Sequence, residues 1–343
     1  MPNILLTSLC NRSCPYCFAE TEMSAATASR FMTWENLIYI ADFLEASDHR
    51  SVSLLGGEPT IHRYFVDFVL YLLERNFTVT VFTNGMVSAA RLAQFKTYFA
   101  DVSAERLHFV CNLNDPIQTP ASEKETRRVH DFLSAMGPWT SPGFNIYRTD
   151  FSLDFLFDYI NRFGLKRSLR LGLTQPIPGK QNAFIRPSEI RAVVQRLYSF
   201  RDRFDLLRVK PGLDCGFPIC QFTDEELGWL HRSGSDALFG CGPAFDISPD
   251  MSVYYCFPLS NYRRKSLFDF DSVEQVDAHF RSTRDPIKAE SPGIFAECDG
   301  CRYQEDGLCA GGGLCQAIHR FIDEAPIRLP EIEHELSKIR MSS

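Results

Sequence analysis

The stretch that decides the fold is Cys10-Asn11-Arg12-Ser13-Cys14-Pro15-Tyr16-Cys17-Phe18. It follows a short apolar run, residues 4–6, with the character of a buried strand. The three thiols are spaced C-x3-C-x2-C on one loop, so they can turn inward together and hold three corners of a cubane iron–sulfur cluster. A fully ligated cubane takes four thiolates. This loop therefore leaves one iron open to a ligand that chelates through an amine and a carboxylate.

A structural zinc knuckle is the alternative for this loop. Structural zinc usually takes four protein ligands, with one C-x2-4-C pair meeting a second pair. No fourth Cys or His lies nearby, because the first histidine of the chain is His49. The spacing therefore favours the iron–sulfur cluster over zinc.

With Tyr16 in the aromatic position before the third cysteine, the loop resembles the signature of the radical SAM superfamily. The resemblance implies that Cys10, Cys14 and Cys17 bind a [4Fe-4S] cluster. It also implies that Tyr16 lies against the adenine of S-adenosylmethionine (SAM). The implied chemistry is transfer of one electron to the sulfonium, which cleaves SAM to methionine and a 5′-deoxyadenosyl radical.

A second motif, Gly56-Gly57-Glu58-Pro59, ends the next predicted strand. Two glycines permit close approach of the backbone to a ligand, and Glu58 supplies an acceptor at the carboxyl end of a strand. Taken alone, the stretch could equally be a tight strand-to-helix turn. After the cysteine loop it resembles the family's GGEP motif, which implies that Gly56, Gly57 and Glu58 hold the methionyl amino group of SAM.

Later strands of the family contact the SAM ribose and carboxylate through looser motifs. On that resemblance we assign Asn112, Asn145 and Arg148 to SAM binding, and an arginine suits a bidentate carboxylate contact. A surface or capping role is the alternative for each of them. The turn at residues 83–85, Thr-Asn-Gly, is either a ligand-binding turn or a plain turn. Cys111, alone on an apolar strand, is expected to be a buried small hydrophobe.

Strand-like runs alternate with helical patterns through the first ~200 residues, which is typical of an α/β fold. We predict strands at 4–6, 51–55, 77–83, 107–110, 144–147 and 169–173, and helices at 34–44, 64–73, 127–136, 153–163 and 187–204. Six β/α repeats match the partial (β/α)6 barrel that the resemblance implies. We place this barrel in residues 1–206 and a small cysteine-rich domain with a C-terminal helix in residues 207–343.

Eight cysteines lie beyond that boundary: Cys215, Cys220, Cys241, Cys256, Cys298, Cys301, Cys309 and Cys315. Twelve cysteines in a chain without export signals are better explained as metal ligands than as disulfides. Eight thiols equal the requirement of two closed cubanes. Zinc remains an alternative for the C-x2-C pair of Cys298 and Cys301.

This half resembles the SPASM extension of radical SAM enzymes. The stretch 241–256 looks like its hairpin between two ligands, and the last four cysteines look like its cysteine core. The final spacings are longer here, and no cysteine follows Cys315. The resemblance implies two auxiliary [4Fe-4S] clusters, making three clusters in all. Carried over by position, the thiols divide into two closed sets: Cys241, Cys256 and Cys315 with one of the pair Cys215/Cys220, and Cys298, Cys301 and Cys309 with the other member.

Composition excludes several function classes. A hydrophobic content of 45% with 23% charged residues is ordinary for a globular protein with a sizeable core. The net charge of −7 argues against a nucleic-acid surface. No basic segment precedes an apolar run at the N-terminus, and no run reaches the ~18–20 residues that span a bilayer. We therefore expect a cytoplasmic protein with neither nucleic acid nor membrane as a partner.

Together these patterns predict an oxygen-sensitive radical SAM oxidoreductase that uses an external one-electron reductant. Our first substrate class is a ribosomally made peptide that is oxidised or crosslinked during natural-product maturation. The lack of a leader-binding extension before the first strand favours a different substrate, and a peptide substrate would need a separate recognition protein. The alternative substrate is a small metabolite such as a sugar or alcohol. A non-catalytic iron–sulfur electron carrier is a third hypothesis, against which the GGEP motif argues. Asp214, beside Cys215, is the candidate catalytic base.

Overall fold

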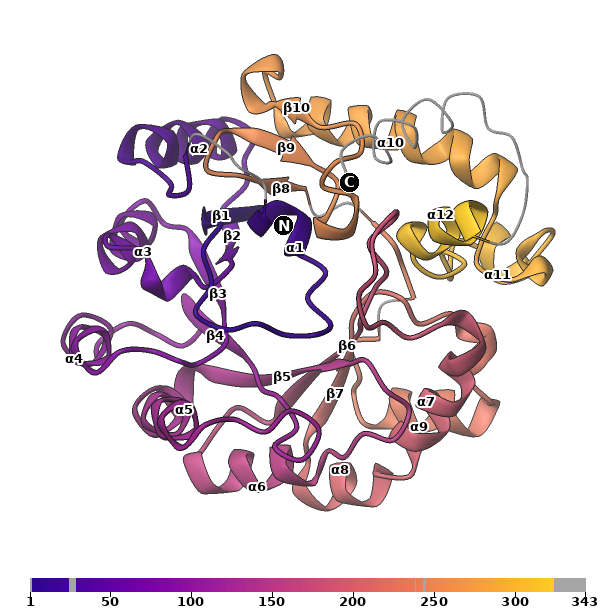
Figure 1. Ribbon diagram of the computed structural model, residues 1–343, viewed down its shortest axis with the longest axis horizontal. Helices are drawn as coiled ribbons and strands as arrows, with labels where there is room; N and C mark the ends of the chain where they lie inside the picture. The colour runs from indigo at the N-terminus through magenta and orange to yellow at the C-terminus, as the bar shows by residue number, and fades with distance from the viewer. Residues whose placement is uncertain (1, 25–28, 238, 243–244, 324–343) are drawn as a thin grey trace.

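The computed structural model describes residues 2–24, 29–237, 239–242 and 245–323. It contains one ten-stranded sheet in the order β10-β9-β8-β1-β2-β3-β4-β5-β6-β7. Neighbours from β1 to β7 run parallel, β8 is parallel to β1, and β9 and β10 are antiparallel. The sheet curves around the middle of the molecule with the helices outside it (Figure 1). The α/β partial-barrel class predicted from the sequence is confirmed.

The strands are β1 (Asn3–Thr7), β2 (Ser51–Gly56), β3 (Thr78–Thr83), β4 (Leu107–Asn112), β5 (Thr140–Ile146), β6 (Ser168–Leu173), β7 (Lys210–Leu213), β8 (Asp246–Ile247), β9 (Ser252–Tyr254) and β10 (Lys265–Ser266). The helices are α1 (Glu20–Ser24), α2 (Trp34–Ala46), α3 (Phe65–Glu74), α4 (Ala89–Tyr98), α5 (Glu123–Met136), α6 (Asp154–Phe163), α7 (Ile190–Tyr198), α8 (Arg201–Leu207), α9 (Asp224–Arg232), α10 (Val273–Glu290), α11 (Arg302–Glu305) and α12 (Leu314–Asp323). No helix among the residues described is long and apolar enough to cross a membrane.

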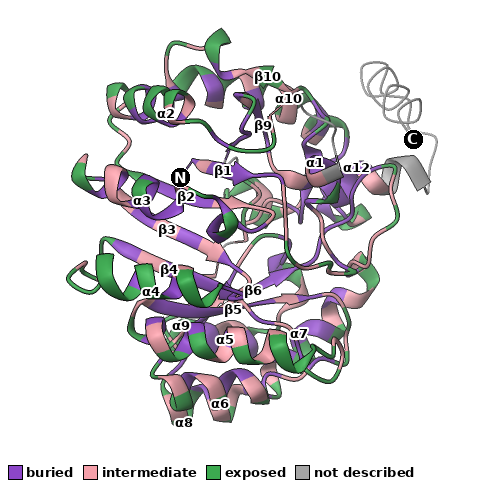
Figure 2. Cartoon of the chain, turned by 60° about the vertical axis from the view of Figure 1, so that its left-hand side comes forward, coloured by how far each residue is buried: buried purple, intermediate pink, exposed green. Residues whose placement is uncertain are grey.

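The apolar core lies between the sheet and the helices. Leu169, Leu171 and Leu173 of β6 are buried on this outer side, because side chains alternate between the two faces of a strand. On the helices, buried residues lie toward the sheet and exposed residues lie on the outer side (Figure 2). Capping fixes where helices begin. At the start of α5 the Ser122 hydroxyl accepts a hydrogen bond from the backbone N–H of Glu125, and the Glu125 carboxylate accepts one from the backbone N–H of Ser122.

Two predicted elements need correction. The single helix predicted at 187–204 is wrong, because a 3-10 turn (Pro187–Glu189) precedes α7 and the chain breaks again before α8. The fifth strand begins at Thr140, four residues before the predicted start at 144. Its first half, Thr-Ser-Pro-Gly, contains proline and glycine, which are depleted in strands, and it pairs with β4 along its whole length.

The sheet runs across the boundary predicted at residues 206 and 207. β7 lies just beyond this boundary and pairs with β6. The chain then returns to the opposite edge, where β8 pairs with β1. The boundary itself stays a prediction. For the predicted C-terminal helix, α12 begins at Leu314, and residues 324–343 lie outside the described residues.

Candidate functional site

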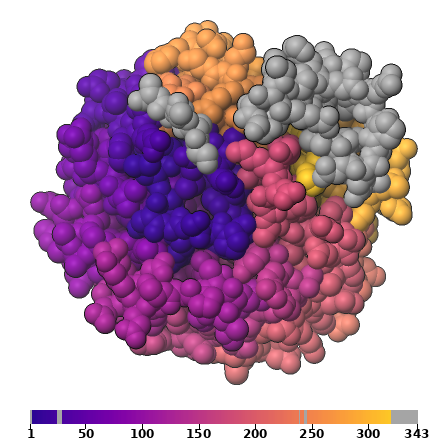
Figure 3. All heavy atoms as spheres, in the orientation of Figure 1, coloured from indigo at the N-terminus to yellow at the C-terminus, as the bar shows by residue number. Residues whose placement is uncertain are grey.

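The cysteine loop follows β1 and lies at the carboxyl ends of the parallel strands. Cys10, Cys14 and Cys17 are all half-buried. Figure 3 shows the indigo N-terminal segment at the centre of one face, beside the rose-coloured chain near residue 180. A backbone bond from Ala183 N–H to the Pro15 carbonyl, 3.1 Å, joins the two. The structure thus places all three thiols on one half-buried loop, and their binding of a cluster stays a prediction.

The charges of three neighbouring thiolates must be compensated for the cysteine loop to hold them together. Burial, together with the nearby charges of Cys14 and Cys10, raises the pKa of the Cys17 thiol to about 11. Three thiolates in one half-buried place repel each other unless a metal group compensates their charge. The donor set of the loop thus fits an iron–sulfur cluster, whose irons bind deprotonated thiols.

The number of thiols in the loop helps to distinguish an iron–sulfur cluster from a single metal ion as the bound group. Nowhere in the described part of the chain do three Cys, His, Asp or Glu side chains gather closely enough to ligate one metal ion. Tetrahedral zinc, with Zn–S of about 2.3 Å, would hold its sulfurs about 3.8 Å apart. The loop offers three thiols and no fourth protein ligand, which favours a cubane with one open iron over structural zinc.

The two glycines of the GGEP turn lie against the cysteine loop. Gly57 N–H donates to the Thr7 carbonyl at 2.9 Å, and Glu58 N–H donates to the Leu9 carbonyl at 2.8 Å. A Cβ on Gly56 would come within 2.2 Å of the Thr7 oxygen, and one on Gly57 within 2.2 Å of the Leu9 oxygen. The expected close approach is present, but the backbone approached is that of the cysteine loop. Their contact with SAM stays a prediction.

Glu58 is fully buried and fixes the ends of two strands. Its carboxylate accepts from the Thr60 hydroxyl at 2.7 Å, the Thr83 hydroxyl at 2.8 Å and the Asn84 backbone N–H at 2.7 Å. Burial raises the pKa of Glu58, while these hydrogen bonds pull it back down. The Asn84 side-chain NH2 group in turn donates to the side-chain oxygen (Oδ1) of Asn11 at 2.8 Å. The turn at 83–85 is therefore tied to the cysteine loop.

Tyr16 is buried, and its ring stacks on Tyr147 with centroids 4.9 Å apart and planes at 27°. Its hydroxyl donates to the side-chain oxygen of Asn114, whose NH2 group lies 4.0 Å from the Cys14 sulfur. Burial raises the pKa of Tyr16 well above its usual value, so the phenol is neutral. Sequence reasoning assigned no role to Asn114 or Tyr147. The predicted adenine contact stays a prediction, with one ring face of Tyr16 already covered.

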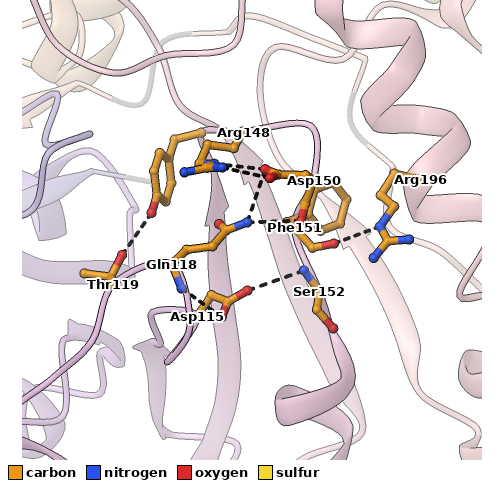
Figure 4. Close-up of polar contacts among 9 residues, drawn as sticks. Asp115, Gln118, Thr119, Arg148, Asp150, Phe151, Ser152 and Arg196 are labelled. Carbon is orange, nitrogen blue, oxygen red and sulfur yellow. Dashed lines mark hydrogen bonds and ion pairs between the residues drawn. The ribbon is translucent and has the colours of Figure 1, made fainter.

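Arg148, predicted to meet the SAM carboxylate, instead holds a carboxylate of the chain. Its Nε and Nη2 donate to Asp150 at 2.9 and 2.7 Å, and both side chains are more than half exposed. Figure 4 shows Gln118 reaching the same Asp150 while Asp115 accepts from Ser152. The structure thus places Arg148 in a surface network, and its role toward SAM stays a prediction.

Asn145 and Asp214 meet at Arg170 on the inner side of the sheet. Arg170 forms an ion pair with Asp214 and donates to the Asn145 oxygen at 3.4 Å. The side-chain oxygen of Asn112 is buried and has no hydrogen-bond partner. The candidate base Asp214 is therefore an ion-paired carboxylate next to Cys215.

A cavity of about 400 Å³ lies beside the cysteine loop. Its lining includes Asn11, Arg12, Ser13, Asn114, Glu125 and His130. A volume of this size suits a small ligand. No sequence pattern indicates that Glu125 and His130 of α5 line this cavity, because both occupy ordinary helix positions.

The eight downstream thiols fall into two sets by their mutual influence. After burial, the charges of Cys315, Cys241 and Cys215 raise the pKa of Cys256. Burial likewise raises the pKa of Cys298, and the charges of Cys220, Cys301 and Cys309 add to it. We call Cys215, Cys241, Cys256 and Cys315 the first thiol set, and Cys220, Cys298, Cys301 and Cys309 the second thiol set.

Donors point at sulfurs in both sets. In the first, the Leu314 backbone N–H lies 3.3 Å from the Cys241 sulfur. In the second, the Gly311 N–H lies 3.3 Å from the Cys309 sulfur, and the Gln221 amide lies 3.6 Å from the Cys220 sulfur. Such hydrogen bonds stabilise thiolates and tune iron–sulfur clusters. Each set therefore has the donor number and the surroundings that suit a four-thiolate cubane.

Comparisons with known proteins agree with this chemistry. The radical SAM superfamily matches residues 4–130. Over 217 residues the chain is 24% identical to molybdenum cofactor biosynthesis protein 1 of Drosophila melanogaster, which covers 60% of this chain and 35% of that protein. The chain spans about a third or less of the length of the curated relatives it matches first.

Two solved structures share the fold over nearly the whole chain. Streptococcus suis SuiB bound to the precursor peptide SuiA has a TM-score of 0.62 at 13% identity, covering 95% of this chain and 74% of SuiB. The enzyme anSMEcpe with bound AdoMet has a TM-score of 0.62 at 16% identity, covering 100% of this chain and 97% of its own. The likeness includes the cysteine-rich half. The first part of the chain, residues 4–130, is therefore similar to the radical SAM superfamily, and the chain as a whole shares the fold of these two solved structures.

Proposed function

We propose that this radical SAM enzyme oxidises or crosslinks a ribosomally made peptide. The observation that carries the proposal is the shared fold with SuiB over 95% of the chain, because SuiB was solved with a precursor peptide bound. The two four-thiol sets support an oxidation, since they give the enzyme a place to put an electron taken from the substrate.

The residues of the cysteine loop prepare the radical step. Cys10, Cys14 and Cys17 would hold three irons of a [4Fe-4S] cluster, which supplies one electron to the sulfonium of SAM when bound. Glu58 holds the GGEP turn rigid beside that loop, so the methionyl amino group would meet a fixed backbone. Asn112, Asn145 and Arg148 remain our proposed contacts to the rest of SAM.

The first and second thiol sets would each hold a closed auxiliary cluster. This assigns Cys215 to the first set and Cys220 to the second. Four thiolates leave no iron vacant for a substrate thiol or amine. Closed clusters therefore favour electron acceptance over direct ligation of the substrate. Asp214, between Arg170 and Cys215, is the proposed proton acceptor on that side.

The proposed partners are an external one-electron reductant and a separate protein that recognises the leader of the peptide. The net charge of −7 again gives no reason to propose nucleic acid. We propose a cytoplasmic location, where reductants and nascent peptides are both at hand.

Oxidation of a small metabolite is the second candidate. The observation in its favour is the match of 217 residues to a protein named for the biosynthesis of a cofactor, molybdenum cofactor biosynthesis protein 1.

The test is anaerobic reconstitution with SAM and dithionite, followed by incubation with any short peptide found to be encoded beside the gene. A peptide product lighter by two hydrogens, formed together with 5′-deoxyadenosine, supports the proposal. Consumption of a sugar or alcohol with the peptide unchanged would favour the second candidate. A protein that forms no 5′-deoxyadenosine at all would be an electron carrier.

A further inference from the structure

A lysine contacts the segment that joins the two thiol sets. Residues 309–315 begin with Cys309 of the second thiol set and end with Cys315 of the first. Lys288 lies in the last turn of α10, and its Nζ atom donates to the Ala310 carbonyl of this segment at 3.1 Å. Lys288 is therefore fixed beside the backbone that follows Cys309.

A backbone bond brings the same place close to the first thiol set. The Ala310 N–H donates to the Phe239 carbonyl at 2.8 Å, and Phe239 precedes Cys241 by two residues. Ala310 is thus adjacent to a cysteine of one set and bonded to the chain that leads into a cysteine of the other. Lys288, which binds Ala310, is next to both sets.

The charges that act on Lys288 agree with this position. Burial lowers the pKa of its ammonium group, whereas the charges of Cys241 and Cys309 raise it. Such an attraction weakens with distance and is screened by solvent, so it acts at short range. The two cysteines belong to different thiol sets. One half-buried cation therefore faces thiols of both.

Lys288 has no carboxylate partner in the described part of the chain, where its hydrogen bond goes to a carbonyl. The adjacent acid, Asp285, already pairs with Arg284 at 2.7 Å. Arg284 lies one turn before Lys288, and like charges at this spacing destabilise a helix. Burying an ammonium group without a counter-charge is unfavourable. The thiolates of the two sets are the anions that would make this cation favourable.

A purely structural role is the alternative. A lysine near the carboxyl end of a helix interacts favourably with the helix dipole, and its bond to Ala310 ties α10 to the segment 309–315. A neutral side chain with an N–H donor would keep that bond and lose only the charge. The two roles can therefore be separated by substitution.

We propose that Lys288 is the shared counter-charge of the two auxiliary clusters and raises the reduction potential of both. The inference rests on the proposed function, in which each thiol set holds a closed cluster that accepts an electron. A cluster that takes up one electron gains one negative charge, and a nearby cation stabilises the more negative form. Net charge is among the factors that set the potential of an iron–sulfur cluster. In this role Lys288 acts through the clusters and touches no substrate.

The test is a potentiometric titration of the full-length enzyme, reconstituted anaerobically and followed by electron paramagnetic resonance. Dithionite supplies the electrons, and each auxiliary cluster takes up one. A matched sample with added SAM identifies the signal of the loop cluster, because only that cluster has an open iron. The remaining signals give the midpoint potentials of the two auxiliary clusters.

Three substitutions separate the charge of Lys288 from its hydrogen bond. Lys288→Met removes both, Lys288→Gln removes the charge but keeps a donor for the Ala310 carbonyl, and Lys288→Arg keeps both. We expect Lys288→Met and Lys288→Gln to lower both midpoint potentials by about 59 mV, which is a tenfold change in a one-electron equilibrium. Lys288→Arg should titrate like the wild type.

Arg281→Met is the matched control. Arg281 lies on the same helix, its side chain is 60% exposed, and it pairs with Asp277. Removing this charge should leave both potentials unchanged, because solvent screens it from the thiol sets. Iron analysis of every variant shows whether the clusters are still bound, and Lys288→Gln carries the test if Lys288→Met does not fold.

Several results would overturn the inference. They are wild-type potentials in Lys288→Gln, a shift confined to one cluster, and an equal shift in Arg281→Met. A structural role predicts the first of these, because Lys288→Gln keeps the bond to Ala310. A wild-type enzyme that shows the loop cluster alone would contradict the closed thiol sets of the proposed function, and the inference with them. Iron analysis of the wild type distinguishes that failure from the others.

Discussion

The two cysteine regions of this enzyme are assembled in opposite ways. Three thiols of the cysteine loop come from one short stretch, between Cys10 and Cys17. Each downstream set instead gathers thiols from segments far apart in the chain, such as Cys215 and Cys315 in the first set. A local site is readable from spacing, whereas a gathered site exists only once the sheet has formed. The predictions below separate the two regions, beginning with the largest effect.

Removing the loop thiols should have the largest effect, because it should abolish SAM cleavage and leave the downstream thiol sets intact. We expect the triple variant Cys10→Ala/Cys14→Ala/Cys17→Ala to form no 5′-deoxyadenosine with dithionite, because only this loop leaves an iron open for SAM. Iron bound by the downstream sets should remain. Chromatography of 5′-deoxyadenosine and iron analysis measure the two effects. Cys111→Ala, a buried cysteine outside both regions, is the control and should retain cleavage; persistent cleavage by the triple variant would refute the assignment.

Single substitutions of Cys215 and Cys220 test how the downstream thiols are divided between the first and second thiol sets. These cysteines are near neighbours in sequence but belong to different thiol sets. In the background of the triple variant, we expect Cys215→Ser and Cys220→Ser to alter two different auxiliary clusters, visible as different changes in the Mössbauer spectrum. If both substitutions alter the same cluster, or if either has no effect, the division into the first and second thiol sets is wrong.

Glu58 tests how far the local site depends on its neighbours. Glu58→Ala removes an acceptor of bonds from Thr60, Thr83 and Asn84. Losing a charge-assisted hydrogen bond costs about 1.5–3 kcal/mol, so SAM should bind roughly ten- to a hundredfold more weakly. Iron content should not change. Calorimetric titration measures the affinity, with the exposed Glu35→Ala as a control; wild-type affinity would leave Glu58 a purely structural residue.

The smallest effect is expected for Asp246 on β8, the strand that pairs with β1. Burial raises the pKa of Asp246 to about 8, whereas an unfolded aspartate has a pKa near 3.9. A raised folded pKa means stability that is present at low pH and is lost as the pH rises from about 4 to about 8. Asp246→Asn should remove this loss.

Melting curves at several pH values check this expectation. Between pH 5 and 8 the wild type should lose several degrees relative to Asp246→Asn, because about 1 kcal/mol corresponds to roughly 2–4 °C in a domain of this size. Parallel curves for the two proteins would mean that the carboxyl is already ionised when folded.

The sequence sufficed where structure is local. The cysteine loop, the GGEP turn and six strands all lie where spacing and apolar runs predict them. β7 was missed, because its sequence Lys-Pro-Gly-Leu carries little apolar signal and is held by pairing with β6. Helix α4 was missed as well, since only two of its side chains, Leu92 and Phe95, are buried and its pattern is mostly polar.

The contacts of the site were harder to predict than its members. Nothing in the sequence indicates that Gly56 faces Thr7, or that Arg148 is paired with Asp150, because these depend on where separate elements meet in space. The division of the downstream thiols likewise needed the fold. Counting thiols predicted two closed sets, but only the structure places Cys215 with one and Cys220 with the other.

The position of β1 has a consequence for how the enzyme is made. This first strand lies between β2 and β8, and its Asn3 N–H donates to the Phe245 carbonyl at 3.0 Å. The side-chain bond from Asn3 to Asp246 joins residues 243 positions apart. On the ribosome, the strand that carries the cysteine loop therefore waits with one edge unpaired until most of the chain has emerged. Completion of the sheet on both sides of that strand is accordingly a late event in synthesis, because it needs Asp246 and Ile247.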